Sequence, residues 1–157
     1  MDYTVKGIGK LCVGEAGHMV VLDKAYIPCL KGLQGFGYLN VLWWFSFCDD
    51  VASRQSPVEE NPYQNGPAIL GAFATRSPRR PNPIALSCAQ ITYLDEEAGV
   101  IGLAYIDAAD GSPVLDIKPY TPSLDRVAHP TVPEWCAHWP QTVEASGDFD
   151  WAAEFNF

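Results

Sequence analysis

Arginines on a proline-stiffened loop are the first residues in this sequence whose type and spacing could do chemistry. The segment Gly71–Asn82 carries Arg76, Arg79 and Arg80 between prolines. Because proline fixes the backbone φ angle, such a loop loses little conformational freedom when a ligand binds. A guanidinium group donates two parallel hydrogen bonds to a carboxylate or phosphate, and Asn82 adds a donor and an acceptor. We expect an anion-binding loop; the alternative is a surface loop whose arginines pair with the protein's own carboxylates.

The second segment with chemical potential is Asp107–Tyr120, in which charged and apolar side chains alternate. Strand alternation predicts Asp116 and Lys118 on one face and Leu115 and Ile117 on the other. An acid and a base at this spacing can pair with each other or line the mouth of a cavity. The alternative is a solvated strand face. We expect this segment and the arginine loop to build the functional site together.

Strings within both segments resemble the signature of the TrmO/YaeB-like family, also called VirR-like. They are Phe73–Ser77, Arg80–Ile84 and Asp110–Tyr120, and Leu33–Phe36 is similar to the start of that family's aromatic strand. The resemblance covers roughly residues 5–126 in the same order, which makes it far more specific than a lone glycine motif.

The resemblance implies a fold, a cofactor and an activity. It implies a small β-barrel that binds S-adenosylmethionine, and a homodimer with the site near the subunit boundary. It also implies methylation of N6 of threonylcarbamoyl-adenosine at position 37 of certain transfer RNAs, or of a related acceptor. Carried over by motif, the cofactor-contacting positions are Arg76, Leu86, Ile106, Asp107, Ala108 and Ala109. The family's other signature residues fall on Arg80, Asn82, Asp116, Lys118 and Tyr120.

The residue types in these segments suit methyl transfer. Transfer from a sulfonium is an in-line displacement, so placement of donor and acceptor supplies much of the rate. An arginine could hold the carboxylate of the donor's methionine end, and Asp107 suits its ribose hydroxyls. An amine acceptor must lose a proton, and we hypothesise that Asp116 or Tyr120 accepts it. Lys118 completes the expected catalytic group.

Two departures from the family pattern keep other functions open. The family's Pro-Arg-Gln segment has no counterpart around Cys12–Gly17, and its His-Gln pair falls on Ser46 and Phe47. One alternative is an S-adenosylmethionine-binding regulatory or interaction protein without efficient transfer. Another is a methyltransferase with a small-molecule acceptor. The third is a purely structural partner protein, based on the aromatic C-terminal tail.

Short strands must position these segments. Seven runs have strand-like composition and turn boundaries: Tyr3–Ile8, His18–Leu22, Leu39–Phe47, Ala68–Ala74, Ile84–Leu94, Gly99–Ile106 and Val114–Ile117. They predict a mainly β fold, a small closed or nearly closed barrel of about seven strands. We also expect a helical turn at Leu30–Gly35 and a long surface loop at Asp49–Pro62.

Length and composition bound the organisation of the chain. Its 157 residues, of which 48% are hydrophobic, fit one core. We expect a β-barrel S-adenosylmethionine-binding domain over residues 1–126. Residues 127–157 are expected to form an acidic aromatic tail that packs in extended form on the barrel or on a partner subunit.

Charge and cysteine content exclude several classes of protein. The net charge of −9 disfavours indiscriminate binding to nucleic acid, although a local basic patch could still contact transfer RNA. The five cysteines form no C-x-x-C pair, so neither a disulfide framework nor a metal site is expected. The densest apolar run, Val41–Phe47, is too short to cross a bilayer. The N-terminus lacks a secretory pattern, so we expect a cytoplasmic protein without a membrane partner.

Overall fold

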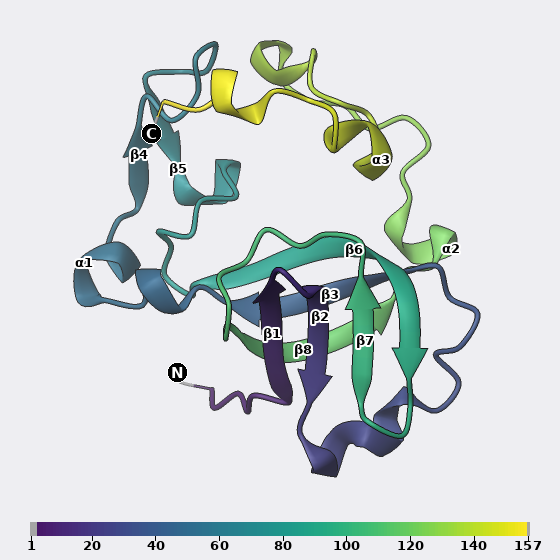
Figure 1. Cartoon of the computed structure of the whole chain (residues 1–157). Coiled ribbons are helices and arrows are strands. Elements are labelled where there is room, and N and C mark those ends of the chain that lie inside the picture. The colour runs from purple at the N-terminus through teal and green to yellow at the C-terminus, as the bar shows by residue number, and fades with distance from the viewer. Residues whose placement is uncertain (1–2, 157) are drawn as a thin grey trace. The chain divides into compact units, whose positions relative to one another are not determined.

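The computed structural model describes residues 3–156 and divides the chain into two compact units (Figure 1). The first unit, here the barrel unit, comprises the chain up to Asp49 together with Pro83–Arg126. The second unit comprises Asp50–Asn82 and the chain from Val127 onward. The two units are described separately below. No helix in the described part of the chain is both long enough and apolar enough to span a bilayer.

The barrel unit is a closed barrel of six antiparallel strands within the described residues. In the closed order the strands are β1 (Gly9–Gly14), β2 (Gly17–Leu22), β7 (Val100–Leu103), β6 (Ile84–Asp95), β3 (Tyr38–Trp44) and β8 (Pro113–Pro119). Its short helices are two 3₁₀ segments, Lys24–Leu30 and Ser46–Cys48, and helix α2 (Pro122–Asp125). The predicted mainly β barrel is therefore confirmed, with six strands in place of about seven.

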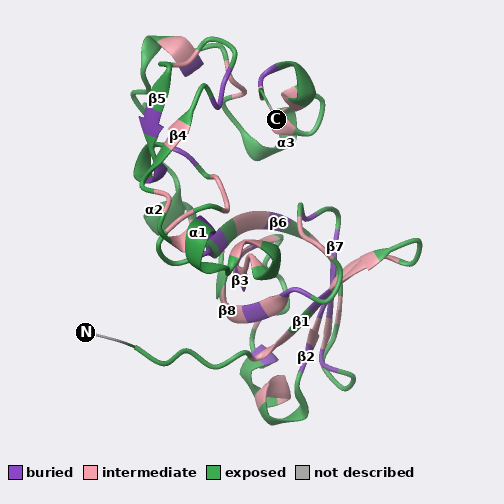
Figure 2. Ribbon diagram, turned by 90° about the vertical axis from the view of Figure 1, so that its left-hand side faces the viewer, coloured by how far each residue is buried: buried purple, intermediate pink, exposed green. Residues whose placement is uncertain are grey.

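Alternation along the strands separates the core from the outer surface. Buried stretches lie along the strands of the barrel (Figure 2). In β3, Leu39, Val41 and Trp43 are buried, while Asn40 and Leu42, which lie between them, are half-buried. The core also contains Leu11, Val20, Ile101 and Val114, each with 0% of its surface exposed. Burial of such aliphatic side chains is the main favourable term in folding, because it removes apolar surface from water.

The first predicted strand, Tyr3–Ile8, is wrong, because β1 begins only at Gly9. Tyr3 and Val5 are exposed, and alternation alone does not form a strand when no neighbouring strand pairs with it. Gly9 lies against the backbone of β2, where a Cβ atom would clash with Val21 O and lie 2.8 Å from Leu22 Cα. The absence of a side chain at Gly9 therefore permits the close pairing of β1 with β2.

A β-bulge at Leu115 changes the simple alternation predicted for β8. Leu42 pairs with Asp116 and Trp43 pairs with Val114, so Leu115 is the extra residue. The bulge lets Val114 and Ile117, three residues apart, both pack into the core. Asp116 and Lys118 still share a face, as predicted.

Three predicted elements in the rest of the chain need correction. At Leu30–Gly35, where a helical turn was expected, a 3₁₀ helix ends at Leu30 and two hydrogen-bonded turns follow, closed by Leu33 N to Leu30 O and by Phe36 N to Leu33 O. The strand expected at Ala68–Ala74 is only β5 (Ile69–Gly71), followed by a 3₁₀ helix over Ala72–Ala74. The loop expected at Asp49–Pro62 contains helix α1 (Val51–Arg54) and strand β4 (Val58–Glu60). Asp50 caps α1, because its carboxylate accepts a hydrogen bond from Ser53 N. A hydrogen bond from Ser53 Oγ, followed by that from Ser53 N, lowers the pKa of Asp50.

The second unit joins the β4–β5 sheet to the C-terminal segment through aromatic side chains. Its other elements are the 3₁₀ helices Glu134–Cys136 and Trp151–Ala153 and helix α3 (Val143–Ser146). The Tyr63 ring stacks on Trp135 with centroids 5.1 Å apart and meets Trp139 and Phe155 at an angle. The tail therefore packs on the segment Asp50–Asn82. Packing of the tail on the barrel or on a partner subunit stays a prediction.

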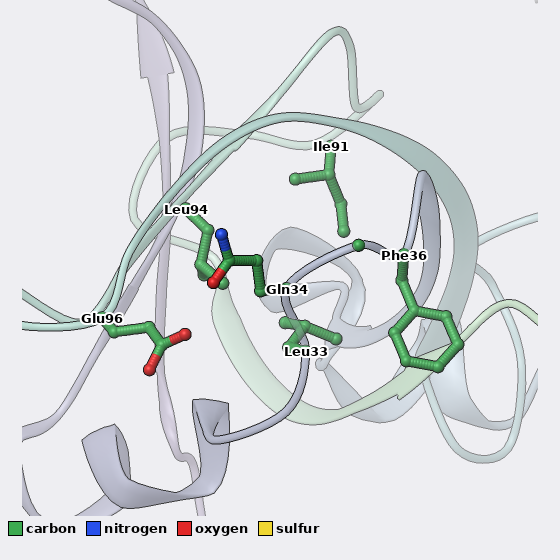
Figure 3. A pocket seen from close by; sticks show the side chains of 7 residues that line it. Leu33, Gln34, Phe36, Ile91, Leu94 and Glu96 are labelled. Carbon is green, nitrogen blue, oxygen red and sulfur yellow. The ribbon is translucent and has the colours of Figure 1, made fainter.

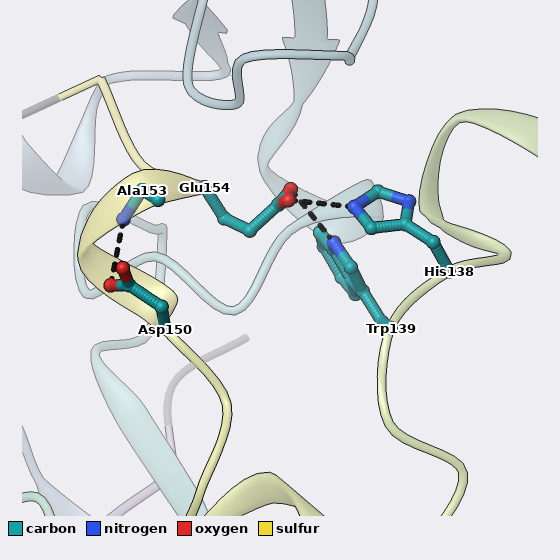
Figure 4. Close-up of polar contacts among 5 residues, drawn as sticks. All are labelled: His138, Trp139, Asp150, Ala153 and Glu154. Carbon is teal, nitrogen blue, oxygen red and sulfur yellow. Dashed lines mark hydrogen bonds and ion pairs between the residues drawn. The ribbon is translucent and has the colours of Figure 1, made fainter.

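Glu154 joins two parts of the tail through partly buried hydrogen bonds to His138 and Trp139 (Figure 4). Its carboxylate contacts His138 Nε2 at 2.6 Å and accepts a hydrogen bond from Trp139 Nε1 at 3.0 Å, and the residue is 8% exposed. The hydrogen bond with His138, followed by that from Trp139, lowers the pKa of the Glu154 carboxyl below its ordinary value.

We expect the second unit to lose stability as the pH falls below about 4.5, the ordinary pKa of a glutamate. A lowered folded-state pKa contributes stability that is present above the unfolded value and is lost as pH falls through the folded one. Glu154→Gln should destabilise the unit at neutral pH and remove this part of the pH dependence. Denaturant unfolding followed by tryptophan emission measures both effects. The exposed control Glu134→Gln should leave them unchanged, and equal effects in the two variants would contradict the assignment.

Candidate functional site on the outer face of the barrel

The outward side chains of β6, β3 and β8 form a continuous surface that we call the signature face. It consists of two rows across the strands, Leu86–Leu42–Asp116 and Cys88–Asn40–Lys118. Residues directly opposite each other on paired strands project to the same side of the sheet. Leu86 is 48% exposed, which confirms that this side faces outward. The register therefore brings Leu86, a predicted cofactor contact, into one row with Asp116, a predicted catalytic residue.

Asp116 and Lys118 form an ion pair on this face. Lys118 Nζ lies 2.6 Å from Asp116 Oδ2, while Asp116 Oδ1 accepts a hydrogen bond from Ile117 N at 2.9 Å. The Lys118 and Asp116 side chains are 63% and 48% exposed, so the pair contributes little to folding stability. Both groups are accessible to a ligand and to solvent, so a ligand-binding pair and a solvated strand face both fit this geometry.

Tyr120 lies directly beyond the end of β8. Its backbone N–H donates to the Tyr38 carbonyl at 3.0 Å, and its half-buried ring meets the Tyr38 ring edge-on with centroids 6.3 Å apart. Tyr38 is two residues before Asn40 on β3 and shares its outward side. The predicted catalytic residues Asp116, Lys118 and Tyr120 are thus all contributed by the same region of the barrel.

The turn before β8 is fastened to β1. Asp110 Oδ1 accepts a hydrogen bond from Val13 N at 2.9 Å, and Gly111 N donates to Leu11 O at 2.8 Å. Gly111 has φ of +79°, a conformation that glycine adopts without strain. The buried Ser112 hydroxyl donates to Ala109 O at 2.8 Å. The turn is therefore preorganised by the fold.

The predicted cofactor contacts in this turn differ in accessibility. The Ile106 side chain is part of the barrel core, whereas Ala108 and Ala109 are half-buried and Asp107 is exposed. Partial burial, followed by the nearby Asp107 carboxylate, raises the pKa of Tyr105, so its hydroxyl stays protonated at neutral pH. Asp107 is the member of this group whose side chain can reach a ligand.

The arginine loop belongs to the second unit, and Arg80 helps to build it. Arg80 Nη2 donates to Ala72 O at 3.1 Å, and Arg80 Nη1 donates to Ser77 O at 3.4 Å. The Ser77 hydroxyl donates to Glu59 Oε1 at 2.6 Å, and Arg54 Nε donates to Pro81 O at 3.1 Å. Hydrogen bonds thus stiffen the loop in addition to its prolines.

Three further polar side chains of the loop, those of Arg76, Arg79 and Asn82, are exposed. Arg79 lines a hollow together with Glu59 and Glu60. Arg80 is therefore occupied by the protein itself, while Arg76 is exposed and positioned by a rigid backbone. Convergence of this loop with the Asp107–Tyr120 segment on one ligand stays a prediction.

A separate hollow of about 430 Å³ lies in the barrel unit (Figure 3). The turn over Leu33–Phe36 faces Ile91 and Leu94 of β6, with Glu96 beside them. None of its seven lining residues is a predicted site residue. The part of the chain that the structure describes contains no group of three or more His, Cys, Asp or Glu side chains arranged to hold a metal ion.

Sequence reasoning missed Asn40 and Asp125. Asn40 Nδ2 donates to Asp125 Oδ1 at 2.9 Å, and Asp125 Oδ2 accepts from Thr121 N at 2.7 Å. Asn40 could have been found as the single amide within the apolar run of β3, because a polar side chain between buried neighbours must face outward.

The geometry first defines a class of protein, a small antiparallel β-barrel whose sequence signature lies on the outer face of three neighbouring strands. Within that class, this chain belongs to the tRNA-methyltransferase O N-terminal domain family, which matches residues 9–126.

The relatives have two kinds of name. A "tRNA (adenine(37)-N6)-methyltransferase" from Escherichia coli (strain K12) is 33% identical over 142 residues, which are 89% of this chain and 57% of the relative. An "S-adenosyl-L-methionine-binding protein" from Archaeoglobus fulgidus is 38% identical over 113 residues, 72% of this chain and 76% of that protein. The crystal structure of TrmO from Pseudomonas aeruginosa superposes with a TM-score of 0.60 at 28% identity. That match covers 83% of this chain and 62% of that chain. This chain thus spans less than two thirds of the bacterial methyltransferases it matches.

Proposed function

We propose that this chain is an S-adenosylmethionine-dependent methyltransferase that modifies N6 of adenosine at position 37 of transfer RNA, in its threonylcarbamoyl form. Family membership over residues 9–126 and the name of the Escherichia coli relative support the activity. The observation that carries the proposal is the signature face, where Leu86, Asp116 and Lys118 occupy adjoining rows beside Tyr120.

The predicted cofactor contacts, taken unit by unit, have side chains whose chemistry suits S-adenosylmethionine. Leu86 and Leu42 offer an apolar surface suited to an adenine ring, and the exposed Asp107 carboxylate suits ribose hydroxyls. Arg76, exposed on the stiff loop, suits the carboxylate of the methionine end. When bound, the cofactor supplies a methyl group activated by a positively charged sulfur.

This chain's own residues would then remove a proton from the acceptor amine. Both Asp116 oxygens already have partners, because Oδ2 contacts Lys118 Nζ and Oδ1 accepts a hydrogen bond from the backbone of Ile117. We therefore propose that the Tyr120 oxygen accepts the amine proton and passes its own hydroxyl proton to water, while the N–CH3 bond forms and the S–CH3 bond breaks. The Asp116–Lys118 pair orients the acceptor base.

Two measurements test the proposal in order. Calorimetric titration with S-adenosylmethionine should show binding, and the ligand should raise the unfolding temperature because it binds only the folded chain. Incubation with transfer RNA that lacks the modification should then yield N6-methylated nucleoside. Because the net charge is −9, we expect binding to transfer RNA to involve few phosphates and to depend weakly on salt. Binding of S-adenosylmethionine without methyl transfer would refute the proposed enzymatic activity and would support a binding protein.

Arg76→Gln should weaken S-adenosylmethionine binding by about 10–100-fold, the value of a lost hydrogen bond to a charged group. Calorimetry measures the change in Kd. The matched control Arg126→Gln, an exposed arginine outside the signature, should leave Kd unchanged. Equal affinities of the Arg76 variant and the parent chain would remove Arg76 from the cofactor site.

The second candidate function is S-adenosylmethionine binding without transfer. The Archaeoglobus fulgidus relative bears a name that mentions only binding, and this chain covers more of it than of the Escherichia coli enzyme.

We also propose that the chain works as a homodimer in the cytoplasm. Light scattering of the purified chain tests this proposal. A monomeric mass at micromolar concentration would contradict the dimer.

A further inference from the structure

The carboxylate of Asp125 joins strand β3 to the backbone directly after Tyr120. Its Oδ1 accepts a hydrogen bond from Asn40 Nδ2 at 2.9 Å, and its Oδ2 accepts one from Thr121 N at 2.7 Å. The Thr121 N–H belongs to the peptide group that follows Tyr120, while the Tyr120 N–H donates to Tyr38 O at 3.0 Å. Strand β3 therefore fixes the backbone on both sides of Tyr120, through Tyr38 on one side and through Asn40 and Asp125 on the other.

Asn40 occupies the centre of its row on the signature face, between Cys88 and Lys118. Its amide donates to a carboxylate, and such charge-assisted hydrogen bonds are stronger than neutral ones. Asp125 is also held within its own turn, because its N–H donates to Thr121 O at 2.9 Å. The turn of α2 is thereby attached to β3 by side chains as well as by the strand pairing that ends at Pro119.

We propose that Asn40 and Asp125 form a positioning pair that orients Tyr120 for methyl transfer, an inference that rests on the proposed function. The pair acts through the backbone of Tyr120 and does not contact the reacting groups. A displacement of a reacting group by about 1 Å can reduce a rate about 100-fold, so a fixed backbone at this position has a large effect on turnover.

Exchange of the donor and the acceptor gives a sharp test. Asn40→Asp places two carboxylates opposite each other and removes the donor. The double variant Asn40→Asp/Asp125→Asn restores both bonds, because the new amide at position 125 donates to the new carboxylate at position 40 and still accepts from Thr121 N. Asn65→Asp, the same change at an exposed turn of the second unit, is the control.

We expect Asn40→Asp to reduce kcat for transfer RNA methylation by about 100-fold and the double variant to regain most of it. In a Tyr120→Phe background the same change at Asn40 should cause little further loss, because residues that act through one another are non-additive. A purely structural role would produce the same loss in both backgrounds. If Asn40→Asp does not fold, Asn40→Ala removes the donor without adding charge and enters the same comparison.

The possible results separate this inference from the proposed function. Full activity of Asn40→Asp, absence of rescue in the double variant, or equal losses with and without the Tyr120 hydroxyl would overturn the positioning pair while the parent chain still methylates transfer RNA. Absence of methylation by the parent chain would refute the proposed function, and the positioning pair with it.

Discussion

Tyr120→Phe is expected to lower kcat for methylation of transfer RNA by at least about 100-fold, the usual contribution of a positioned acid or base. The change deletes one hydroxyl and keeps the ring that contacts Tyr38. The backbone hydrogen bond to Tyr38 also remains, so the unfolding midpoint and the Kd for S-adenosylmethionine should not move. Single-turnover kinetics at saturating cofactor measure the effect on the chemical step.

The matched control for this prediction is Tyr93→Phe on β6. Tyr93 is an exposed tyrosine of the barrel, whereas Tyr120 is half-buried. The Tyr93 hydroxyl donates to the weak acceptor Met19 Sδ at 3.9 Å. It should retain the parent rate. If Tyr120→Phe were as active as Tyr93→Phe, the proton would have to leave through another group, and Asp116→Asn would become the decisive variant.

Gly9→Ala is expected to destabilise the barrel by about 1–3 kcal/mol, the usual cost of overpacking. The added Cβ would clash with Val21 O and lie 2.8 Å from Leu22 Cα, both backbone atoms that cannot move without disturbing the β1–β2 pairing. Gly9 also pairs with Val114 of β8, so β1 is held on both sides. Urea denaturation measures the change in the free energy of unfolding.

Gly14→Ala provides the comparison within the same strand. A Cβ at Gly14 meets no atom within 4 Å, and replacing an unstrained glycine restricts the unfolded chain. We therefore expect a change close to zero or a slight stabilisation. Similar losses of stability in both variants would show that the close approach of β1 and β2 at Gly9 is not the cause of the destabilisation.

Local sequence was sufficient to predict strands that pair with the next strand along the chain, because their pairing needs only a short turn between them. The β6–β7 hairpin lies where two successive strands, Ile84–Leu94 and Gly99–Ile106, were predicted from composition and turn boundaries. Strand β1 was missed because glycines stand at both of its ends and lower its apparent strand character. The short turn between Gly14 and Gly17 was a usable hairpin signal, and it places β1 after the predicted Tyr3–Ile8.

The site was predictable where it depends on neighbours in sequence. The pairing of Asp116 with Lys118 follows from their spacing on one strand. The Asn40–Asp125 contact was not predictable, because it joins residues 85 positions apart and exists only once β3 pairs with β8. The internal role of Arg80 was equally hidden, since its acceptors are carbonyl groups that only the folded loop directs at it.

The most direct test of the central claim is mass spectrometry of nucleosides from unmodified transfer RNA after incubation with this chain and S-adenosylmethionine carrying a deuterated methyl group. We predict that the label appears on N6 of the threonylcarbamoyl-adenosine at position 37, and that Tyr120→Phe nearly abolishes it. Transfer RNA without label, under conditions where calorimetry shows bound cofactor, would contradict the account.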